Sequence, residues 1–558
     1  MDAWTSLGLP ETLAPDAPFD VAELLRRRAA ERPHQRAIVV PRGHDAEGRA
    51  RWAQVTFRQL DRLVDRRARA LRAAGVAPGD KVVLLVPPGI ELVALVFAIF
   101  RAGAVMVLID PGMGARAFVD CLAQVAPQAL VGTWKAHAAL HVVGRRLLGT
   151  LRTRIRVGGG LPFGTPLGSL LSGLGEGQAP ASGRRAGDTA GILFTSGSTG
   201  PAKGVVYSHG LIAAQTRRIG RLYGIEPGEV DVPGLPGFAL FSVALGATVV
   251  FPEMDYARPG RLDPARFVEA IEDHGATYSF GSPAIWGKVA RSCVERGARL
   301  PSLRRVLMAG APVPPSVHED LRRVLPEGAW GHTPYGATEA LPVASTHGGE
   351  LAETFATTRA GDGTCVGRPA EGIELRVIRV VDGPIAAWSD DLLMPAGGIG
   401  ELVVAGDVVT TAYEARPEAT ARAKIQDGAR VWHRMGDLGR VDPDGRVWFC
   451  GRVGHRVETA AGLVHSGLEA VFAEEPRVAR CALVGVSGRP VLVVEARNGA
   501  PRQALAHDLL ALGKARPETA QVKDVLFHPG LPVDVRHNAK IRRELLATWA
   551  AEQLGSAQ

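Results

Sequence analysis

An apolar strand pattern that alternates with a helical pattern constrains the fold of this chain more than any other feature. Lys81 to Val86 is an apolar run, Ile90 to Phe100 has the length and composition of a helix, and Ala104 to Leu108 is a second apolar run. Strands that are buried on both faces read as continuous apolar runs, and a helix between two of them is typical of a parallel βαβ unit. This region therefore predicts a parallel sheet covered by helices.

The same alternation recurs later in the chain. Ala276 to Phe280 leads into a helix that begins at Pro283, and Arg305 to Met308 ends in Gly-Ala-Pro before a helix opened by Ser316. Alternating strands and helices pack as layers with helices on both faces of a sheet. We therefore predict the α/β class, with a large N-terminal domain of doubly wound layers.

The predicted elements become shorter and richer in strands in the last third of the chain. From about Gly400, short strands such as Glu401 to Val404 and Arg446 to Phe449 are separated by Gly and Asp turns, which predicts a β-rich subdomain. The residues after Gly451 are numerous enough for a small α+β domain with its own strands. We place the boundary between residues 452 and 453, giving domains 1–452 and 453–558.

Two further segments are assigned by composition. The stretch from Gly158 to Gly187 is rich in Gly, Ser and Pro and is predicted to be a surface connection. Val82 to Ile109 is the most apolar window, but Pro87, Glu91 and Arg101 interrupt it, so it falls short of a membrane span. We expect a protein that is not integral to the membrane. The first residues do not show the basic stretch followed by an apolar stretch that is typical of a signal peptide, so we expect the protein in the cytoplasm.

The overall composition fits a globular enzyme. Hydrophobic residues make up 46% and charged residues 22% of the 558 residues, with a mean hydropathy of +0.06. The net charge of +8 comes from scattered arginines without a block of like charges, so we predict no nucleic-acid partner. Such a surface suits ATP, acidic partners or lipid headgroups. The five cysteines are widely spaced, and we expect buried, reduced thiols.

The most informative run of the chain follows the apolar strand Gly191 to Phe194. It reads Thr195, Ser196, Gly197, Ser198, Thr199, Gly200, Pro201, Ala202, Lys203, Gly204. Glycines let backbone amides approach phosphate oxygens, hydroxyls add donors, and the lysine adds positive charge. The run is not a Walker A motif, because Lys203 follows an alanine and no Ser or Thr comes after it. A phosphate-binding loop is predicted here, with a flexible linker as the alternative.

This run resembles the signature loop of the adenylate-forming superfamily, which includes acyl-CoA synthetases, luciferases and peptide-synthetase adenylation domains. The run from Tyr335 through Gly336 to Glu339 resembles the second signature of that family. The resemblance implies that the aromatic ring stacks on adenine, that Thr338 meets the α-phosphate and that Glu339 holds Mg²⁺. ATP and Mg²⁺ are the implied cofactors.

Four more runs match the family in the expected order. Gly310-Ala311-Pro312 is similar to its strand-end adenine contact, Asp437 to its ribose-binding aspartate, and Gly451-Arg452 to the end of its large domain. His537-Asn538-Ala539-Lys540 resembles its C-terminal lysine loop. The resemblance implies that Lys540 lies on a mobile C-terminal domain and stabilises charge on the reacting carboxylate and α-phosphate. Lys203 and the loop amides would hold the pyrophosphate.

The sequence departs from the family pattern in the part that serves thiol transfer. Gly454 replaces the usual hinge Asp or Lys, Glu458 replaces an expected lysine, and no histidine occurs between His209 and His274. The run from Leu235 to Phe241 is instead apolar and aromatic. It suits a lipid-like acyl chain, with plain core packing as the alternative.

Within the superfamily, the amino-acid sequence around the signature runs is similar to that of the β-lactone synthetases of bacterial long-chain olefin biosynthesis. This resemblance implies a 2-alkyl-3-hydroxy fatty acid substrate, a long-chain β-hydroxy acid, whose 3-hydroxyl attacks its own acyl adenylate. It also implies assembly with other olefin-pathway enzymes. His209 is a candidate to polarise the hydroxyl or the carboxylate. Two alternatives remain open: a long-chain acyl-CoA synthetase or acyl-AMP ligase, and a non-catalytic nucleotide-sensing protein.

Overall fold

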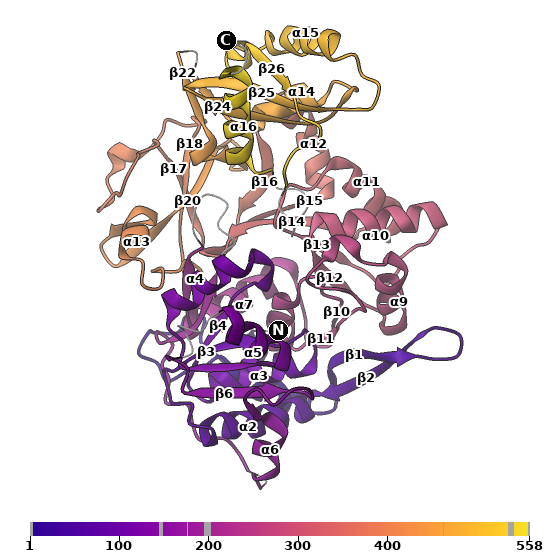
Figure 1. Cartoon of the computed structure of the whole chain (residues 1–558), viewed down its shortest axis with the longest axis vertical. Coiled ribbons are helices and arrows are strands. Elements are labelled where there is room, and N and C mark those ends of the chain that lie inside the picture. Colours follow the sequence, from indigo (N-terminus) through magenta and orange to yellow (C-terminus); the bar gives the residue numbers. More distant parts are fainter. Residues whose placement is uncertain are drawn as a thin grey trace.

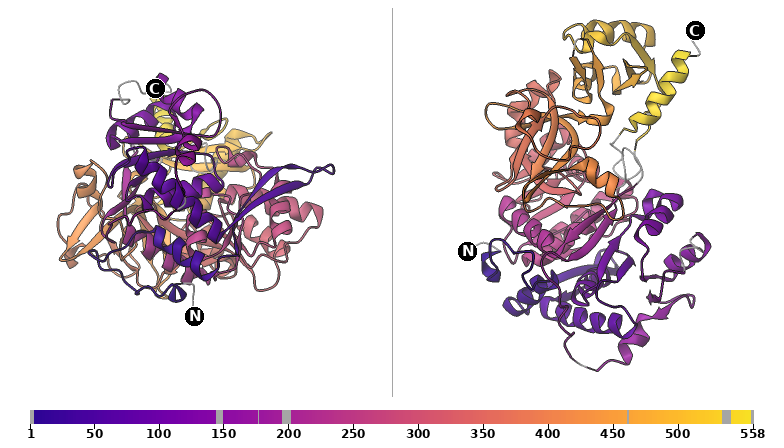
Figure 2. Two further views of the ribbon diagram at one scale, coloured as in Figure 1. Left: turned by 90° about the horizontal axis from the view of Figure 1, so that it is seen from below. Right: turned by 90° about the vertical axis from the view of Figure 1, so that its left-hand side faces the viewer.

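The computed structural model describes residues 4–143, 149–175, 177–194, 202–460, 462–533 and 541–555. Two large sheets form the lower and middle parts of the molecule, and a smaller sheet with its own helices forms the opposite end (Figure 1). The right-hand view of Figure 2 shows the C-terminal residues at one end of the long axis. The fold is α/β.

The first large sheet has seven strands. In spatial order they are β7 (Thr165–Pro166), β6 (Thr153–Val157), β5 (Ala129–Thr133), β3 (Lys81–Leu85), β4 (Val105–Leu108), β8 (Thr189–Phe194) and β9 (Gly204–Ser208). Neighbouring strands from β7 to β8 are parallel, and only β9 at the edge runs antiparallel to its neighbour β8. The predicted βαβ unit is confirmed as β3, α3 (Ile90–Arg101) and β4.

Helices cover both faces of this sheet, as the strand pattern predicts. Val82 packs into a core with α1 (Ala22–Glu31), α2 (Phe57–Ala73), α3 and α6 (Leu167–Ser172), whereas its neighbour Val83 packs into a core with α4 (Ala115–Val125) and α5 (Trp134–Val143). Successive side chains of a strand point to opposite faces, so a central strand such as β3, covered on both faces, carries apolar residues at successive positions.

The second large sheet has fourteen strands. In spatial order they are β17 (Glu374–Ile378), β18 (Gly400–Ala405), β20 (Arg430–Val441), β21 (Val447–Arg452), β16 (Thr364–Pro369), β15 (Ala340–His347), β14 (Trp330–Ala337), β13 (Arg305–Met308), β12 (Tyr278–Gly281), β10 (Val230–Asp231), β11 (Thr248–Val250), β1 (Arg36–His44) and β2 (Ala50–Thr56), with β19 (Lys424–Asp427) paired to β20.

The pairing in this sheet changes partway along. From β1 through β14 the neighbours are parallel, and from β14 to β17 every pair is antiparallel. The helices of the parallel part are α7 (His209–Tyr223), α8 (Ala239–Leu245), α9 (Pro264–His274), α10 (Pro283–Arg296) and α11 (Pro315–Val324), followed by α12 (Gly348–Arg359) and α13 (Pro417–Ala423) near the antiparallel part. The predicted β-rich region is thus a continuation of the α/β sheet.

The C-terminal residues have a separate set of strands. They are β22 (Val457–Thr459) and β23 (Gly462–Val464), which pair with each other, and β24 (Val478–Val486), β25 (Arg489–Ala496) and β26 (Asp524–Phe527), which form one sheet. The helices α14 (Glu469–Ala473), α15 (Arg502–Gly513) and α16 (Arg543–Gly555) pack on them. Both apolar clusters of this part draw only on residues from Val457 onward.

Two details differ from the sequence analysis or add to it. The predicted surface connection from Gly158 to Gly187 contains β7 and α6, and Leu167 is buried against the core that α2 shares, because its apolar residues recur at helical spacing. All five cysteines are buried and free, as expected. Among the described residues, no helix combines the length and the apolar character that a membrane crossing requires.

Candidate active site

A pocket of about 1000 Å³ opens at the carboxyl ends of β12, β13 and β14. Ligands of α/β folds usually bind at this edge, where the connections leave parallel strands. The pocket is also lined by Lys203, which follows the strand β8, and by Arg452 at the end of β21. The antiparallel part of the second sheet therefore faces the first sheet across the pocket.

One wall of the pocket is apolar. Ile219 and Tyr223 from the last turns of α7 line it together with Leu235 and Phe238, and Phe280 of β12 stacks on Phe238 with an angle of 10° between the rings. These side chains belong to one apolar cluster. The predicted apolar run from Leu235 to Phe241 thus contributes both to core packing and to the pocket.

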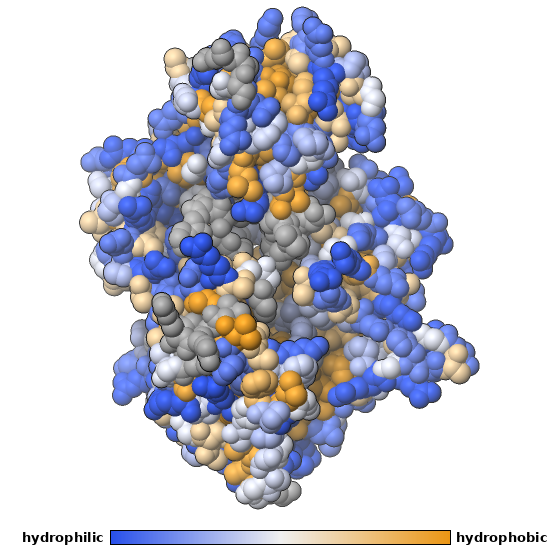
Figure 3. All heavy atoms as spheres, in the orientation of Figure 1, coloured by the Kyte–Doolittle hydropathy of each residue, from blue (hydrophilic) through white to orange (hydrophobic). Residues whose placement is uncertain are grey.

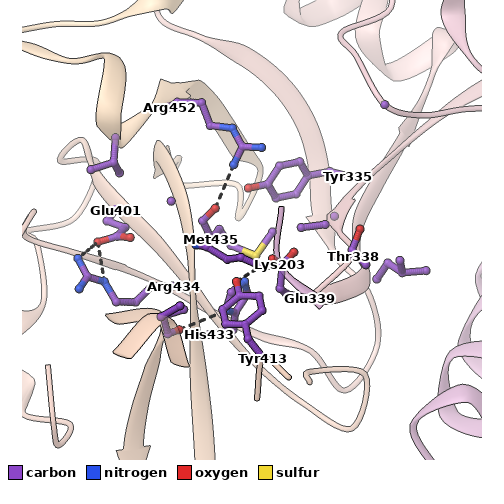
Figure 4. Close-up of a pocket in the computed structure, with 18 of the residues that line it drawn as sticks. Lys203, Tyr335, Thr338, Glu339, Glu401, Tyr413, His433, Arg434, Met435 and Arg452 are labelled. Carbon is purple, nitrogen blue, oxygen red and sulfur yellow. Dashed lines mark hydrogen bonds and ion pairs between the residues drawn. The ribbon is translucent and has the colours of Figure 1, made fainter. Parts of the chain in front are cut away.

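The facing wall is polar and is built from residues far apart in the chain (Figure 4). The hydroxyl of Tyr335 donates to Asp437 Oδ2 over 2.7 Å, and the Arg452 guanidinium lies 2.9 Å from Asp437 Oδ1. Asp437 and Arg452 are direct partners in the β20–β21 pairing. Burial and the neighbouring Asp437 carboxylate raise the pKa of Tyr335, so its hydroxyl stays a donor.

Glu339 lies in the tight turn between β14 and β15 and faces the pocket. The Tyr413 hydroxyl donates to Glu339 Oε1 over 2.7 Å, and the Lys203 ammonium stands 5.1 Å from the centre of the Tyr413 ring. Thr410 holds the turn from behind, because its backbone N–H and its hydroxyl both donate to the Glu339 carbonyl, at 2.9 and 3.0 Å. A carboxylate and an ammonium are thereby held near each other on one wall.

Lys424 is a buried cation beside this turn that the sequence analysis does not identify. Its ammonium donates to Thr410 Oγ1 over 3.2 Å, and only 3% of the residue is exposed. Burial lowers the pKa of Lys424 to about 7, while the Glu339 charge opposes that shift. Its strand partner His433 lines the pocket, and burial holds the pKa of His433 well below its ordinary value, so that imidazole is neutral.

The structure brings together most of the predicted site residues that it describes. Lys203, Gly310, Tyr335, Gly336, Thr338, Glu339 and Arg452 line the same pocket, and Asp437 contacts two of them. Ala311 and Pro312 follow Gly310 on the connection after β13. The predicted residues Thr195, Ser196, Gly197, Ser198, Thr199, Gly200 and Lys540 lie outside the described residues.

His209 does not take the place that the sequence analysis gives it. It is fully buried at the start of α7, where its Nδ1 accepts the backbone N–H of Val21 over 3.2 Å and its ring meets the edge of Phe100. Burial lowers the pKa of His209 to about 4. The reason is topological. Because β9 runs antiparallel to β8, the chain returns to the end of the sheet where β8 begins, away from the pocket, before α7 starts.

Tyr413, Lys424 and Thr410 are the site residues that sequence reasoning missed. None of them belongs to a recognisable motif, and Tyr413 is 74 residues from its partner Glu339. A tyrosine between Ala412 and Glu414 carries no signal of its own. Their role emerges only because the connection after β18 crosses behind the turn that carries Glu339.

The sequence predicts Glu339 as the metal-binding residue, and its carboxylate lines the pocket. Among the described residues, no group of three or more His, Cys, Asp or Glu side chains is arranged to hold a metal ion by itself. Mg²⁺ is usually held by one or two carboxylates together with phosphate oxygens of the substrate and water. Glu339, with hard oxygen donors that face the pocket, fits that requirement.

Comparison with known proteins agrees with this geometry. Residues 25–414 match the family model described as AMP-binding enzyme. The chain is 44% identical to olefin β-lactone synthetase of Stenotrophomonas maltophilia, over 96% of this chain and 99% of that protein. It is 44% identical to olefin β-lactone synthetase of Xanthomonas campestris pv. campestris, over 96% of this chain and 98% of that protein.

A solved structure supports the same assignment of the fold. The amide bond synthetase McbA from Marinactinospora thermotolerans superimposes with a TM-score of 0.76 at 25% identity, over 95% of this chain and 99% of that chain. The family model covers both walls of the pocket up to Tyr413, and the curated relatives extend over nearly the whole sequence. The chain therefore belongs to the AMP-binding enzyme family, and it is an ATP-dependent, adenylate-forming ligase.

Proposed function

We propose that this ligase converts a 2-alkyl-3-hydroxy long-chain fatty acid to a β-lactone, in the biosynthesis of long-chain olefins. The observation that carries the proposal is a pocket with two chemically different walls, in a chain that is 44% identical to olefin β-lactone synthetases over nearly its whole length. The apolar wall suits an alkyl chain, and the polar wall suits a nucleotide with its phosphates.

In the first step a substrate carboxylate oxygen attacks the α-phosphorus of ATP. A new O–P bond forms, the bond to the pyrophosphate leaving group breaks, and an acyl adenylate results. Two anionic reactants meet, so the site has to neutralise charge and align the groups. Lys203 supplies positive charge on the polar wall, and we assign the ribose hydroxyls to Asp437, whose contacts with the pocket residues Tyr335 and Arg452 support the assignment.

Glu339 is the residue that would hold Mg²⁺, which supplies charge neutralisation to the phosphates. Tyr413 holds the Glu339 carboxylate, and Thr410 holds the Glu339 carbonyl. Thr338, in the same turn, lines the pocket, which supports its assignment to the α-phosphate. Lys540 and residues 195–200 lie outside the described residues. We assign Lys540 to the transition-state charge and residues 195–200 to the pyrophosphate on the family resemblance alone.

In the second step the 3-hydroxyl oxygen of the substrate attacks its own acyl carbon. A C–O bond closes the four-membered ring, the bond to AMP breaks, and the hydroxyl proton leaves to solvent or to a phosphate oxygen of AMP. Because attack is intramolecular, a pocket that holds the hydroxyl against the carbonyl gains rate from proximity and offsets ring strain. No thiol acceptor takes part, which fits Gly454 and Glu458 at the positions of the usual hinge and lysine.

Two further parts of the proposal concern the setting of the reaction. The product is a strained lactone, so an enzyme that consumes it is expected to act next, and we propose assembly with the other enzymes of olefin synthesis. Because ATP is a substrate, we propose that the reaction takes place in the cytoplasm.

The test is incubation of the purified protein with ATP, Mg²⁺ and a 2-alkyl-3-hydroxy fatty acid, without coenzyme A, followed by mass spectrometry of AMP and lactone. We expect lactone and AMP in equal amounts, and neither product with Lys203→Met. If AMP is released only when coenzyme A or a carrier thiol is supplied, the protein is an acyl-thioester ligase and the proposal is wrong.

A further inference from the structure

The charge of this chain is distributed unevenly in one segment of the first sheet. Between Asp120 and Glu176 the sequence contains no acidic residue. The lysines and arginines of that segment are Lys135, Arg145, Arg146, Arg152, Arg154 and Arg156. A run of this length with cations and no carboxylate creates a positive local field even though the charges are not adjacent in sequence.

Three of these cations lie on one face of the sheet, beside α5. Arg154 and Arg156 alternate along β6 with the fully buried Ile155, so both point to the face that α5 covers. Lys135 is on α5 itself, 5.8 Å from the centre of the Trp134 ring. Among the described residues, no carboxylate forms an ion pair with Lys135, Arg154 or Arg156, whereas Arg152 is paired with Asp80.

The same face carries the two most exposed large hydrophobic residues of the described chain. Val142, near the end of α5, is 79% exposed, and Leu161, in the connection after β6, is 53% exposed. Hydrophobic and hydrophilic residues lie side by side over the α5 region in the space-filling view (Figure 3).

The connection that carries Leu161 is folded onto α5. Gly160 packs so closely on Trp134 that a Cβ atom there would stand 2.2 Å from the indole ring, and Arg156 donates to the Gly160 carbonyl over 3.0 Å. At the other end of the connection, the Phe163 ring lies 6.1 Å from that of His141. Leu161 is therefore held outward between two anchored points.

We infer that this surface, formed by α5 and residues 158–163, binds anionic lipid surfaces, with Val142 and Leu161 entering the interface and Lys135, Arg154 and Arg156 facing the headgroups. Exposed apolar side chains such as Val142 and Leu161, surrounded by cations, favour adsorption to anionic lipid. Each basic residue near the lipid surface and each apolar group buried in it adds to the affinity. None of the five residues lines the pocket.

The choice of a lipid over an acidic protein rests in part on the proposed function, since a long-chain acid partitions into membranes and would reach the enzyme there. It rests also on Val142 and Leu161, two separate exposed apolar side chains beside cations, which is the arrangement that lipid adsorption uses. The inference concerns peripheral binding and leaves the fold unchanged.

The test is co-sedimentation of the full chain with vesicles of phosphatidylcholine, with and without phosphatidylglycerol. We expect binding to the anionic vesicles only, weakened by high salt. The variant Val142→Asp/Leu161→Asp should bind them about tenfold more weakly, because it adds two charges of the wrong sign and removes the apolar tips. The matched control Leu393→Asp/Leu545→Asp changes two exposed leucines elsewhere, at 39% and 46% exposure, and should bind like the unmodified chain.

Several results would overturn the inference. They are absence of binding to anionic vesicles, equal binding by the two variants, and binding of soluble polyglutamate that is as tight as vesicle binding and unaffected by Val142→Asp/Leu161→Asp. The last result would mean that the surface recognises acidic macromolecules. Lactone formation from detergent-dispersed substrate is measured in parallel and should be the same in all variants, so failure of the proposed function is seen separately from failure of lipid binding.

Discussion

At the scale of single residues, the polar wall of the pocket depends on side chains that orient one another. The Tyr335 hydroxyl and the Arg452 guanidinium both contact the Asp437 carboxylate, which is 5% exposed. A carboxylate that accepts a hydrogen bond at one oxygen and has an ion-pair partner beside the other is restricted in direction, so it can present its remaining lone pairs to a ligand with little reorganisation. Removal of one donor should therefore affect nucleotide binding more than folding.

Tyr335→Phe tests this arrangement. We expect kcat/KM for ATP to fall about tenfold, since a hydrogen bond to a charged group contributes about 1.5–3 kcal/mol and about 1.4 kcal/mol corresponds to a factor of ten. The matched control is Tyr223→Phe, whose hydroxyl donates to Ser345 outside the polar wall and should leave kcat/KM for ATP unchanged. An equal fall in kcat/KM for ATP in both variants would contradict the assignment.

His209 gives a prediction of the opposite kind. His209→Ala should keep the rate of acyl adenylate formation within about twofold, because the imidazole is buried between Val21 and Phe100. The free energy of unfolding at pH 7 should fall by about 1–3 kcal/mol, since the Val21 N–H is left buried without its acceptor. Pyrophosphate release and urea unfolding measure the two quantities. A large loss of rate in a stable variant would restore a catalytic role for His209.

The stability difference between the unmodified chain and His209→Ala should depend on pH. The pKa of His209 is about 4 in the folded chain, below its ordinary value of 6.5. Between pH 6.5 and pH 4 the unfolded chain binds more protons at this position than the folded chain, so its contribution to stability is lost as the pH falls. The stability difference between the unmodified chain and His209→Ala should therefore shrink from pH 6.5 to pH 4. A constant difference across that range would show that the imidazole does not titrate as described.

At the scale of elements, the turn between β14 and β15 positions Glu339, and a connection from the antiparallel part of the sheet supports it. Thr410 donates twice to the Glu339 carbonyl and accepts from the buried Lys424 ammonium. The hydroxyl of one threonine thus joins two elements and is also a hydrogen-bond partner of a buried cation. Loss of the Thr410 hydroxyl should therefore lower both the stability of the fold and the rate of catalysis.

Thr410→Val removes the hydroxyl and keeps the shape of the side chain. We expect the free energy of unfolding to fall by about 2–3 kcal/mol, because the Lys424 ammonium loses its hydrogen-bond partner in a buried position. The rate of pyrophosphate release should also fall, because the turn with Glu339 is less firmly held. Thr410→Ser restores the hydroxyl and should recover most of both losses; if it does not, the hydroxyl is not the group that matters.

At the scale of the whole molecule, the C-terminal residues have their own cores, and two exposed ion pairs are among their contacts with the remainder. Arg456 lies 3.0 Å from Asp382, which is 84% exposed in its side chain, and Arg516 lies 2.7 Å from Asp362. Exposed pairs of this kind contribute about 0–1 kcal/mol each. These two pairs therefore contribute little to holding the C-terminal part in one orientation, and its mobility stays a prediction.

The proposed domain boundary leads to a direct experiment. Residues 453–558 expressed alone should fold and unfold cooperatively, because their apolar clusters include no residue before Val457. Circular dichroism and thermal unfolding provide the measurement, and adenylate formation should require the full chain. A fragment without a cooperative transition would show that 1–452 and 453–558 are not independent folding units.

The sequence by itself determined the fold class and the placement of the motifs. Strands buried on both faces need apolar residues at every position, which is why β3, α3 and β4 could be predicted almost to the residue. The family motifs also stand out, because phosphate approach and tight turns demand particular residues at short spacing. The assignments of Thr195 to Gly200 and of Lys540 stay predictions, since these residues lie outside the described ones.

Only the tertiary structure decided which distant side chains meet. Tyr335 and Asp437 are 102 residues apart, and Tyr413 and Glu339 are 74 apart, so their contacts depend on how separate strands pair across the second sheet. His209 follows the phosphate loop closely in sequence, yet the antiparallel strand β9 carries the chain away from the pocket before α7 begins. Local spacing fixes which elements form, whereas the direction and order of strands fix which side chains share a site.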